Sequence, residues 1–145
     1  YSHFSTYSNY VHYNTPMAHP LGANFKELLL IGRYQPFPRI FITFSYLNAI
    51  KGLDFETNGG NYGGDILRLN SDSRVAEYNN TIGQGKKTQT QVFDTVLSFM
   101  LRHNLFLEGH LMKRFYKIPT TQTHDEETYL SAAIRWNIGR KVNLY

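Results

Sequence analysis

The sequence predicts an all-β protein, an antiparallel up-and-down β-barrel that crosses a membrane with its strands. Two observations indicate this fold class. Apolar and polar residues alternate along five long segments, and the connections between these segments are alternately short and long. Successive side chains of a strand point to opposite faces, so this alternation gives each strand one apolar and one polar face. We therefore expect five neighbouring strands of one sheet.

The first of these strands is expected over residues 24–35, after a polar stretch with a further strand over about residues 3–13. Both faces of residues 24–35 are partly apolar, and Glu27 and Arg33 mark the polar face. The trio Pro36-Phe37-Pro38 predicts a hairpin turn, because proline cannot continue a hydrogen-bonded ladder.

The second strand is expected over residues 39–50, where Ile40, Ile42 and Phe44 share the apolar face. A connection over about residues 51–87 follows. It is rich in glycine and asparagine, which tolerate the backbone conformations of turns. We interpret it as a long extracellular loop.

The third and fourth strands, over residues 88–101 and 105–116, are joined by the polar trio Arg102-His103-Asn104 and form a hairpin. The fifth strand is expected over residues 128–138, after a polar connection over residues 117–127. The apolar rows of these three strands contain Phe93, Leu97, Phe99, Leu101, Leu105, Leu107, Leu111, Leu130, Ala132, Ile134 and Trp136.

The length of the segments favours a membrane barrel over a soluble sheet. Twelve residues at about 3.3 Å each extend about 40 Å, and a tilt of about 40° leaves roughly 30 Å of height, which matches a hydrocarbon core. In lipid, strands need a closed barrel to satisfy their backbone groups. Five strands cannot close one, so we expect residues 1–145 to be the C-terminal portion of a larger outer-membrane barrel domain. A soluble, glycan-binding β-sandwich or lipocalin-like barrel is one alternative, because it shows the same alternation. A porin-like solute channel is the other.

The composition of the 145 residues excludes several other classes. An aromatic content of 15% is too high for a disordered segment. The chain has no cysteine, which rules out disulfides, thiolate zinc sites and cysteine nucleophiles. The formal net charge of +4 comes from scattered Lys and Arg residues, so we expect no binding to nucleic acid.

Several motifs resemble the C-terminal part of Bacteroidetes-type outer-membrane barrels, namely the capsule-assembly Wzi-like and the gliding-motility RemB-like proteins. The motifs are His19-Pro20-Leu21-Gly22-Ala23-Asn24-Phe25, the Gly/Asn stretch over residues 57–66, Ile82-Gly83-Gln84-Gly85 and Ile134-Arg135-Trp136-Asn137. The resemblance implies a non-enzymatic protein of the bacterial outer membrane, a scaffold or attachment component for surface polysaccharide or for gliding or secretion machinery. Its implied partners are outer-membrane lipid, surface polysaccharide and other envelope proteins.

The polar faces of the predicted strands supply candidate residues for the lining of the lumen. Charge on the lipid face would cost about 2–4 kcal/mol per residue at the midplane, so charged side chains are expected inside. Asp94, Ser98 and His110 share one hairpin, and simple pairing places Ser98 opposite Glu108. We interpret them as a structural network and not as a catalytic triad, whose imidazole must bond both hydroxyl and carboxylate. The lining candidates are Glu27, Arg33, Asp94, Glu108, His110, Arg114 and Arg135.

The long loop supplies a second set of candidates, for binding a glycan or a partner protein. Asn58, Asn61 and Asp65 offer hydrogen-bonding groups, and Tyr62 offers a ring on which a sugar can stack. A tight loop without a ligand, in which the glycines serve turns, is the alternative. The six histidines show no metal-binding spacing, and we expect neither a metal nor another cofactor.

Overall fold

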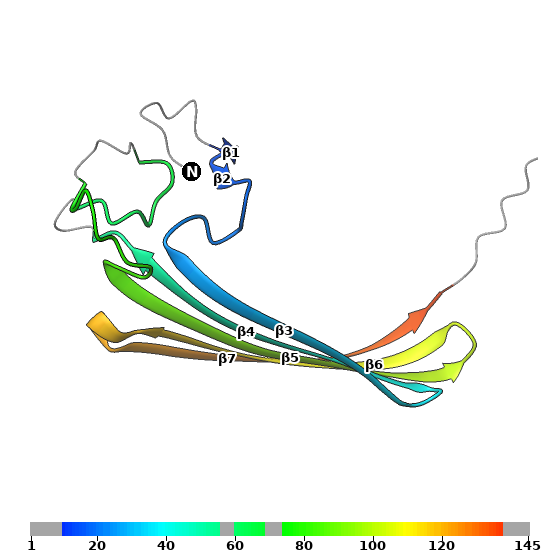
Figure 1. Cartoon of the computed structure of the whole chain (residues 1–145). Coiled ribbons are helices and arrows are strands. Elements are labelled where there is room, and N and C mark those ends of the chain that lie inside the picture. The colour runs from blue at the N-terminus through cyan, green and yellow to red at the C-terminus, as the bar shows by residue number, and fades with distance from the viewer. Residues whose placement is uncertain (1–9, 56–59, 69–73, 138–145) are drawn as a thin grey trace, which may run out of the picture. The chain divides into compact units, whose positions relative to one another are not determined.

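The computed structural model describes residues 10–55, 60–68 and 74–137, and these residues form an all-β protein (Figure 1). Neighbouring strands of the main sheet are consecutive in the chain and antiparallel, which confirms the all-β, antiparallel part of the prediction. In the described residues the sheet is open, so the closed barrel of the prediction is not seen. No helix among these residues is long and apolar enough to cross a membrane. The sheet order is β3 (Phe25–Phe37), β4 (Ile40–Leu53), β5 (Lys86–Arg102), β6 (Leu105–Ile118) and β7 (Thr123–Trp136).

Two short strands precede the sheet. β1 (Val11–His12) pairs antiparallel with β2 (Thr15–Pro16). The turn between them consists of Tyr13 and Asn14, whose φ angles are 47° and 60°. Most of the strand predicted over residues 3–13 lies outside the described residues, and its described end is the two-residue β1.

The first hairpin turn lies later in the chain than predicted. β3 continues through Pro36 and Phe37, and the turn consists of Pro38 and Arg39. A proline is tolerated there because β3 is an edge strand of the described sheet, where a missing N–H need not interrupt a ladder. Of the two prolines that the sequence predicts in the turn, only Pro38 lies there.

The other connections are also shorter than predicted. β4 extends to Leu53 and β5 begins at Lys86, so the long loop covers residues 54–85 and not 51–87. Between β6 and β7 the chain forms only the 3-10 helix η2 (Pro119–Thr121) and Gln122, whose φ angle is 54°. β7 begins at Thr123, five residues before the predicted start. The sequence pattern does not indicate this start, because an exposed strand end can be polar on both faces.

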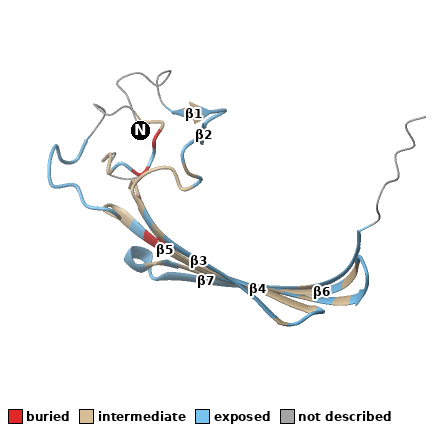
Figure 2. Cartoon of the chain, turned by 45° about the vertical axis from the view of Figure 1, so that its right-hand side comes forward, coloured by how far each residue is buried: buried red, intermediate tan, exposed pale blue. Residues whose placement is uncertain are grey.

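The chain divides into two compact units, which we describe separately. The loop unit comprises Tyr1–Leu28, Asn48–Gln91 and Phe115–Asp125, and the strand unit comprises Leu29–Leu47, Val92–Arg114 and Glu126–Tyr145. Figure 2 shows how few of the described residues are buried. Those with buried side chains are Ala49, Ile66 and Thr88, together with the glycines Gly52 and Gly64, and all five belong to the loop unit.

The strand unit has no buried side chain among its described residues. On its predicted apolar rows, the exposed fraction of the large side chains reaches 49% at Leu111 and 77% at Leu130. The same rows include Phe44, Phe93, Leu97 and Leu107, all of them exposed. The apolar face of these strands is therefore not covered by any other residue that the structure describes.

Candidate functional site

Polar side chains from three neighbouring strands meet on one face of the strand unit. Glu108 of β6 is their centre. Its Oε1 accepts hydrogen bonds from Ser98 Oγ of β5 at 3.1 Å and from Arg135 Nε of β7 at 2.9 Å. Arg135 Nη2 lies 2.7 Å from the same oxygen. The contact between Ser98 and Glu108 is the one that simple pairing of the hairpin predicts.

A second polar pair lies on the same two strands, β5 and β6. His110 Nε2 is 2.7 Å from Asp94 Oδ1, and the His110 ring meets the Tyr129 ring edge-on with centroids 5.4 Å apart. The Ser98 hydroxyl donates to Glu108, and among the described residues it forms no hydrogen bond with His110. The geometry therefore gives two separate pairs and not the hydroxyl–imidazole–carboxylate chain of a triad.

An aromatic contact fixes the guanidinium of Arg135 in place. Its Cζ lies 4.4 Å from the centroid of the Phe106 ring, and Phe106 in turn meets Phe41 edge-on at 6.3 Å. Nη1 of Arg135 donates to Asn137 Oδ1 at 3.2 Å. Because the planar cation is both stacked and hydrogen-bonded, a lysine could not replace it.

The remaining candidate lining residues are more scattered. Arg114 Nη1 lies 3.5 Å from Glu127 Oε2 in the strand unit. Glu27 belongs to the loop unit, where its carboxylate lies 3.6 Å from His19 Nε2. Arg33 forms no ion pair with any residue that the structure describes. All candidate lining residues except Glu27 thus belong to the strand unit, namely Arg33, Asp94, Glu108, His110, Arg114 and Arg135.

The opposite face of the strand unit is apolar. A hollow of about 250 Å³ lies on it, and its lining includes Leu97 and Phe99 of β5, Leu107 and Gly109 of β6 and Ala132 of β7. Tyr46 and Phe93 pack their rings 4.8 Å apart on the same face. Lys113 continues the row of Leu107 and Leu111, and its ammonium lies 3.6 Å from Glu126 Oε2. The apolar part of this β6 row therefore ends at Leu111, and the next residue of the row, Lys113, is charged.

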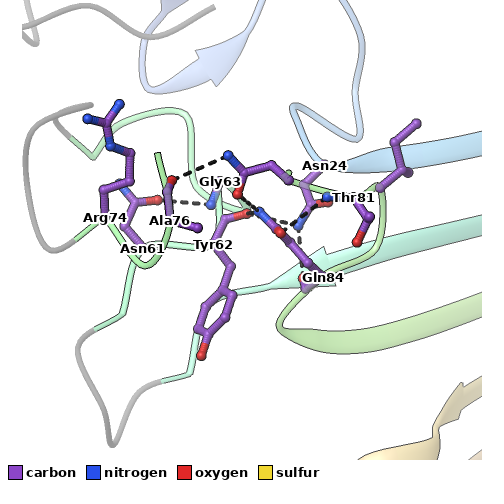
Figure 3. A pocket seen from close by; sticks show the side chains of 10 residues that line it. Asn24, Asn61, Tyr62, Gly63, Arg74, Ala76, Thr81 and Gln84 are labelled. Carbon is purple, nitrogen blue, oxygen red and sulfur yellow. Dashed lines mark hydrogen bonds between the residues drawn. The ribbon is translucent and has the colours of Figure 1, made fainter. Parts of the chain in front are cut away.

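In the loop unit, the side chain of Asn24 holds three chain segments together (Figure 3). Its Nδ2 lies within hydrogen-bond distance of the carbonyl oxygens of Gly52 at 3.2 Å, Tyr62 at 3.2 Å and Gln84 at 3.0 Å. Its Oδ1 accepts from the N–H of Gly83 at 2.7 Å. Asn24 has a φ angle of 55°, which asparagine tolerates better than most residues.

A second side chain, Asp54, organises the loop from its start. Its Oδ1 accepts from the N–H groups of Tyr62 at 2.8 Å and Gly64 at 3.3 Å, and its Oδ2 lies 3.4 Å from Arg68 Nη1. Glycines make this close approach of segments feasible. A Cβ on Gly52 would lie 2.0 Å from the carbonyl oxygen of Gln84. The described residues of the long loop are therefore held in a defined conformation by hydrogen bonds and close contacts between segments.

A hollow of about 310 Å³ opens beside this cluster, and its lining includes Asn24, Asn61, Arg74, Thr81 and Gln84. Most of the amide groups around it already bond within the chain. Gln84 Nε2, for example, donates to the carbonyl oxygen of Tyr62 and to Asn80 Oδ1, both at 3.0 Å. The lining is part polar and part apolar, and much of the hydrogen-bonding capacity of its polar groups is used within the chain.

The predicted loop candidates have different positions. Asn61 and Tyr62 line the hollow, whereas Asp65 does not and instead accepts the N–H of Leu67 at 2.8 Å. The Tyr62 ring points away from the Asn24–Gln84 cluster and packs edge-on against Phe55 at 5.6 Å, so it is no stacking platform within that cluster (Figure 3). Asn58 lies outside the described residues.

Sequence reasoning missed Asn24, Asp54 and Gln84 as the residues that organise the loop. Two signals were present: Asn24 directly precedes a strand and Asp54 directly follows one.

Among the described residues, no group of three His, Asp or Glu side chains could hold a metal ion. No family model, curated protein or solved structure matches the chain significantly.

Proposed function

We propose that this chain forms part of the wall of a β-barrel in a bacterial outer membrane. In this proposal the apolar face of the strand unit contacts lipid, and the face that carries Glu108 and Arg135 is turned to the barrel interior. The chain acts without enzymatic chemistry, as a scaffold or attachment component for surface polysaccharide or for gliding or secretion machinery.

The observation that carries the proposal is the exposure of apolar side chains on one face of the strands. Leu107, Leu111, Leu130 and Ile134 are 45–77% exposed, and the only buried large hydrophobic side chain among the described residues is Ile66. Exposed apolar patches of this kind mark contact with lipid or with a partner. If these side chains were exposed to water, the protein would lose the stabilisation of about 1.5–3 kcal/mol that burial of each would contribute.

The dimensions of the strands support lipid as the contact. The apolar row of β5 runs from Phe93 to Leu101, which at about 3.3 Å per residue and a tilt of about 40° gives roughly 20 Å of height. This is close to the apolar band of about 25 Å that surrounds outer-membrane barrels. Trp136 and Tyr46 add amphipathic rings, which are enriched where lipid meets water.

The opposite face supports an interior position. Two of its carboxylates are paired with cations, Glu108 with Arg135 and Glu127 with Arg114, and Asp94 is hydrogen-bonded to His110. Paired charges of both signs suit a polar barrel interior, where they escape the cost of lipid exposure. This compensation argues for a structural lining and against a porin-like channel selective for one sign of charge.

The soluble alternative is a glycan-binding β-sheet protein, for which the loop unit offers a binding site. The hollow beside Asn61, Arg74 and Thr81 is lined by both polar and apolar groups and is large enough for a sugar unit. In a membrane protein the same hollow would serve polysaccharide attachment. The two proposals therefore differ in the environment of the apolar face and not in the loop.

The single tryptophan of the chain provides the test. Trp136 lies on the apolar row of β7 and is 67% exposed. In vesicles with lipids brominated on their acyl chains, we expect its fluorescence to be strongly quenched. The matched control replaces Trp136→Phe and Phe106→Trp, which moves the reporter to the polar face, where we expect little quenching. Equal quenching of both reporters, or recovery of the protein from cells without detergent, would contradict the membrane proposal.

A further inference from the structure

One asparagine of the long loop has the sequence context of a glycosylation acceptor. Asn79 is followed by Asn80 and Thr81, which gives the pattern Asn-x-Thr with a residue other than proline in the middle. No other asparagine of the chain has serine or threonine two positions later. Because the pattern is short, it needs support from the structure of the loop.

The acceptor pattern lies on an exposed part of the loop unit. Residues 79–81 are all exposed and belong to no strand or helix. The φ angle of Asn79 is 61°, a conformation that is typical of turns. A modifying enzyme must bind the acceptor segment in its own active site. It can bind residues 79–81 without breaking any strand pairing.

The two side chains that define the pattern are not used by the fold. Among the described residues, neither the carboxamide of Asn79 nor the hydroxyl of Thr81 forms a hydrogen bond. The intervening Asn80 is different, because its Nδ2 donates to the carbonyl oxygen of Ala76 at 3.3 Å and its Oδ1 accepts from Gln84 Nε2 at 3.0 Å. The loop therefore occupies the Asn80 side chain and leaves its two neighbours available to an enzyme.

Backbone conformation alone would explain an asparagine at position 79, but it does not explain Thr81. Only backbone groups of Thr81 take part in the loop: its N–H donates to Gln84 Oε1 at 3.3 Å, and its carbonyl oxygen accepts the N–H of Gln84 at 3.2 Å. Glu77 adds a carboxylate two residues before the acceptor. Its side chain is 65% exposed, and its pair with Arg74 at 3.6 Å is weak at such exposure. An exposed carboxylate and an exposed hydroxyl thus flank Asn79, and both are groups that an enzyme can bind.

We propose that Asn79 is an N-glycosylation site, which receives an oligosaccharide from a diphosphate-activated sugar donor through a transferase outside the cytoplasm. In this transfer, Nδ2 of Asn79 attacks the anomeric carbon of the first sugar and forms a C–N bond. The C–O bond between this carbon and the diphosphate breaks, and the diphosphate leaves with the electron pair. One proton of the carboxamide passes to a base of the transferase, and nothing is oxidised or reduced.

The inference rests on the proposed function only for the position of the loop outside the cytoplasm. It goes beyond that function because it assigns a covalent modification to a named atom of the loop. The modification adds no burial cost, since residues 79–81 are already exposed. A bulky polar group attached there remains in water.

Mass spectrometry of the full protein, purified from the cells that naturally produce it, tests the inference. Trypsin cleaves after Arg74 and Lys86, so residues 75–86 form one peptide, in which Asn79 and Asn80 are the only asparagines. Electron-transfer fragmentation keeps a sugar on its side chain and distinguishes the two positions. We expect most copies of this peptide to carry added sugar mass on Asn79. A peptide found only in its unmodified form, or modified on Asn80, would overturn the inference.

Three variants made in the same cells separate enzymatic recognition from a backbone role. Thr81→Val keeps the β-branched shape without the hydroxyl, and we expect it to abolish the modification, whereas Thr81→Ser should retain it. Asn79→Asp keeps a residue that tolerates the positive φ angle but lacks Nδ2, so its peptide should be unmodified. Full modification of the Thr81→Val protein would overturn the inference.

The result is independent of the test of the membrane proposal. Quenching of Trp136 by brominated lipid reports on the apolar face of the strand unit and does not depend on the loop. A glycosylated protein without quenching would retain this inference and remove the membrane proposal. An unmodified protein with strong quenching would do the reverse.

Discussion

Arg135 of β7 and Ser98 of β5 converge on a single carboxylate oxygen, Oε1 of Glu108, from the two strands that flank β6. The distances to this oxygen are 2.9 Å from Arg135 Nε, 2.7 Å from Arg135 Nη2 and 3.1 Å from Ser98 Oγ. One carboxylate thus links three strands on the polar face. Because hydrogen bonds to charged groups are stronger than neutral ones, we infer that this oxygen contributes to the pairing of β6 with β7.

Removal of Arg135 should therefore weaken the sheet measurably but modestly. We expect Arg135→Met to lower the free energy of unfolding by about 1 kcal/mol, because the pair is partly exposed and solvent screens it. Urea unfolding of the protein in lipid vesicles measures the change. The double variant with Glu108→Gln should cost less than the sum of the two single changes. Strictly additive costs would show that the two side chains do not interact.

Asn24 should be more important for the loop than any other asparagine of the described chain. Asn24→Ala removes contacts to four backbone groups, at about 1 kcal/mol each, and we expect a loss of about 2–4 kcal/mol with faster proteolysis of the loop over residues 54–85. Asn79→Ala is the matched control. Asn79 also has a positive φ angle, 61°, so it shares the backbone penalty without the Asn24 contacts. Similar losses from both changes would assign the effect to the backbone alone.

Gly52 and Gly109 should respond in opposite ways to an added methyl group. A Cβ on Gly52 would lie 2.0 Å from the Gln84 carbonyl oxygen, whereas a Cβ on Gly109 would meet nothing within 4 Å. We expect Gly52→Ala to cost more than about 2 kcal/mol, because backbone must move, and Gly109→Ala to be neutral or slightly stabilising. Thermal unfolding of both variants measures this. A tolerated Gly52→Ala would mean that the segments approach less closely than described.

Sequence periodicity predicted the strands well where one face is apolar and poorly where it is not. Leu105, Leu107 and Leu111 gave the start of β6 correctly, whereas the polar residues Thr123–Glu127 hid the start of β7. Pro36 was assigned to a turn because its place at a sheet edge is a tertiary property. Periodicity carries no information on which strand is an edge.

Local pattern also explains which parts of the candidate site were predictable. The contact between Ser98 and Glu108 follows from hairpin register alone, since both residues lie close to one turn. The Asn24 cluster joins segments 28 to 60 positions apart in the sequence, so no local pattern reveals it. Gly52 and Gly64 can be read from the sequence, but the requirement for glycine at these positions comes from contact with backbone that is distant in the sequence.

Two adjacent residues of β6 provide the sharpest test of which face contacts lipid. Leu111 lies on the apolar row with a 49% exposed side chain, and Met112 lies on the polar face at nearly the same height. We expect Leu111→Lys to lower the free energy of unfolding in lipid vesicles by about 1–2 kcal/mol, less than the roughly 2–4 kcal/mol of a lysine at the bilayer midplane, because Leu111 lies one step along the row from the charged Lys113. Met112→Lys should cost clearly less, because its ammonium reaches a polar interior beside carboxylates. If the protein were surrounded by water, the exposed Leu111 would accept lysine at little cost. If the loss from Met112→Lys were larger than the loss from Leu111→Lys, the polar face and not the apolar face would contact lipid.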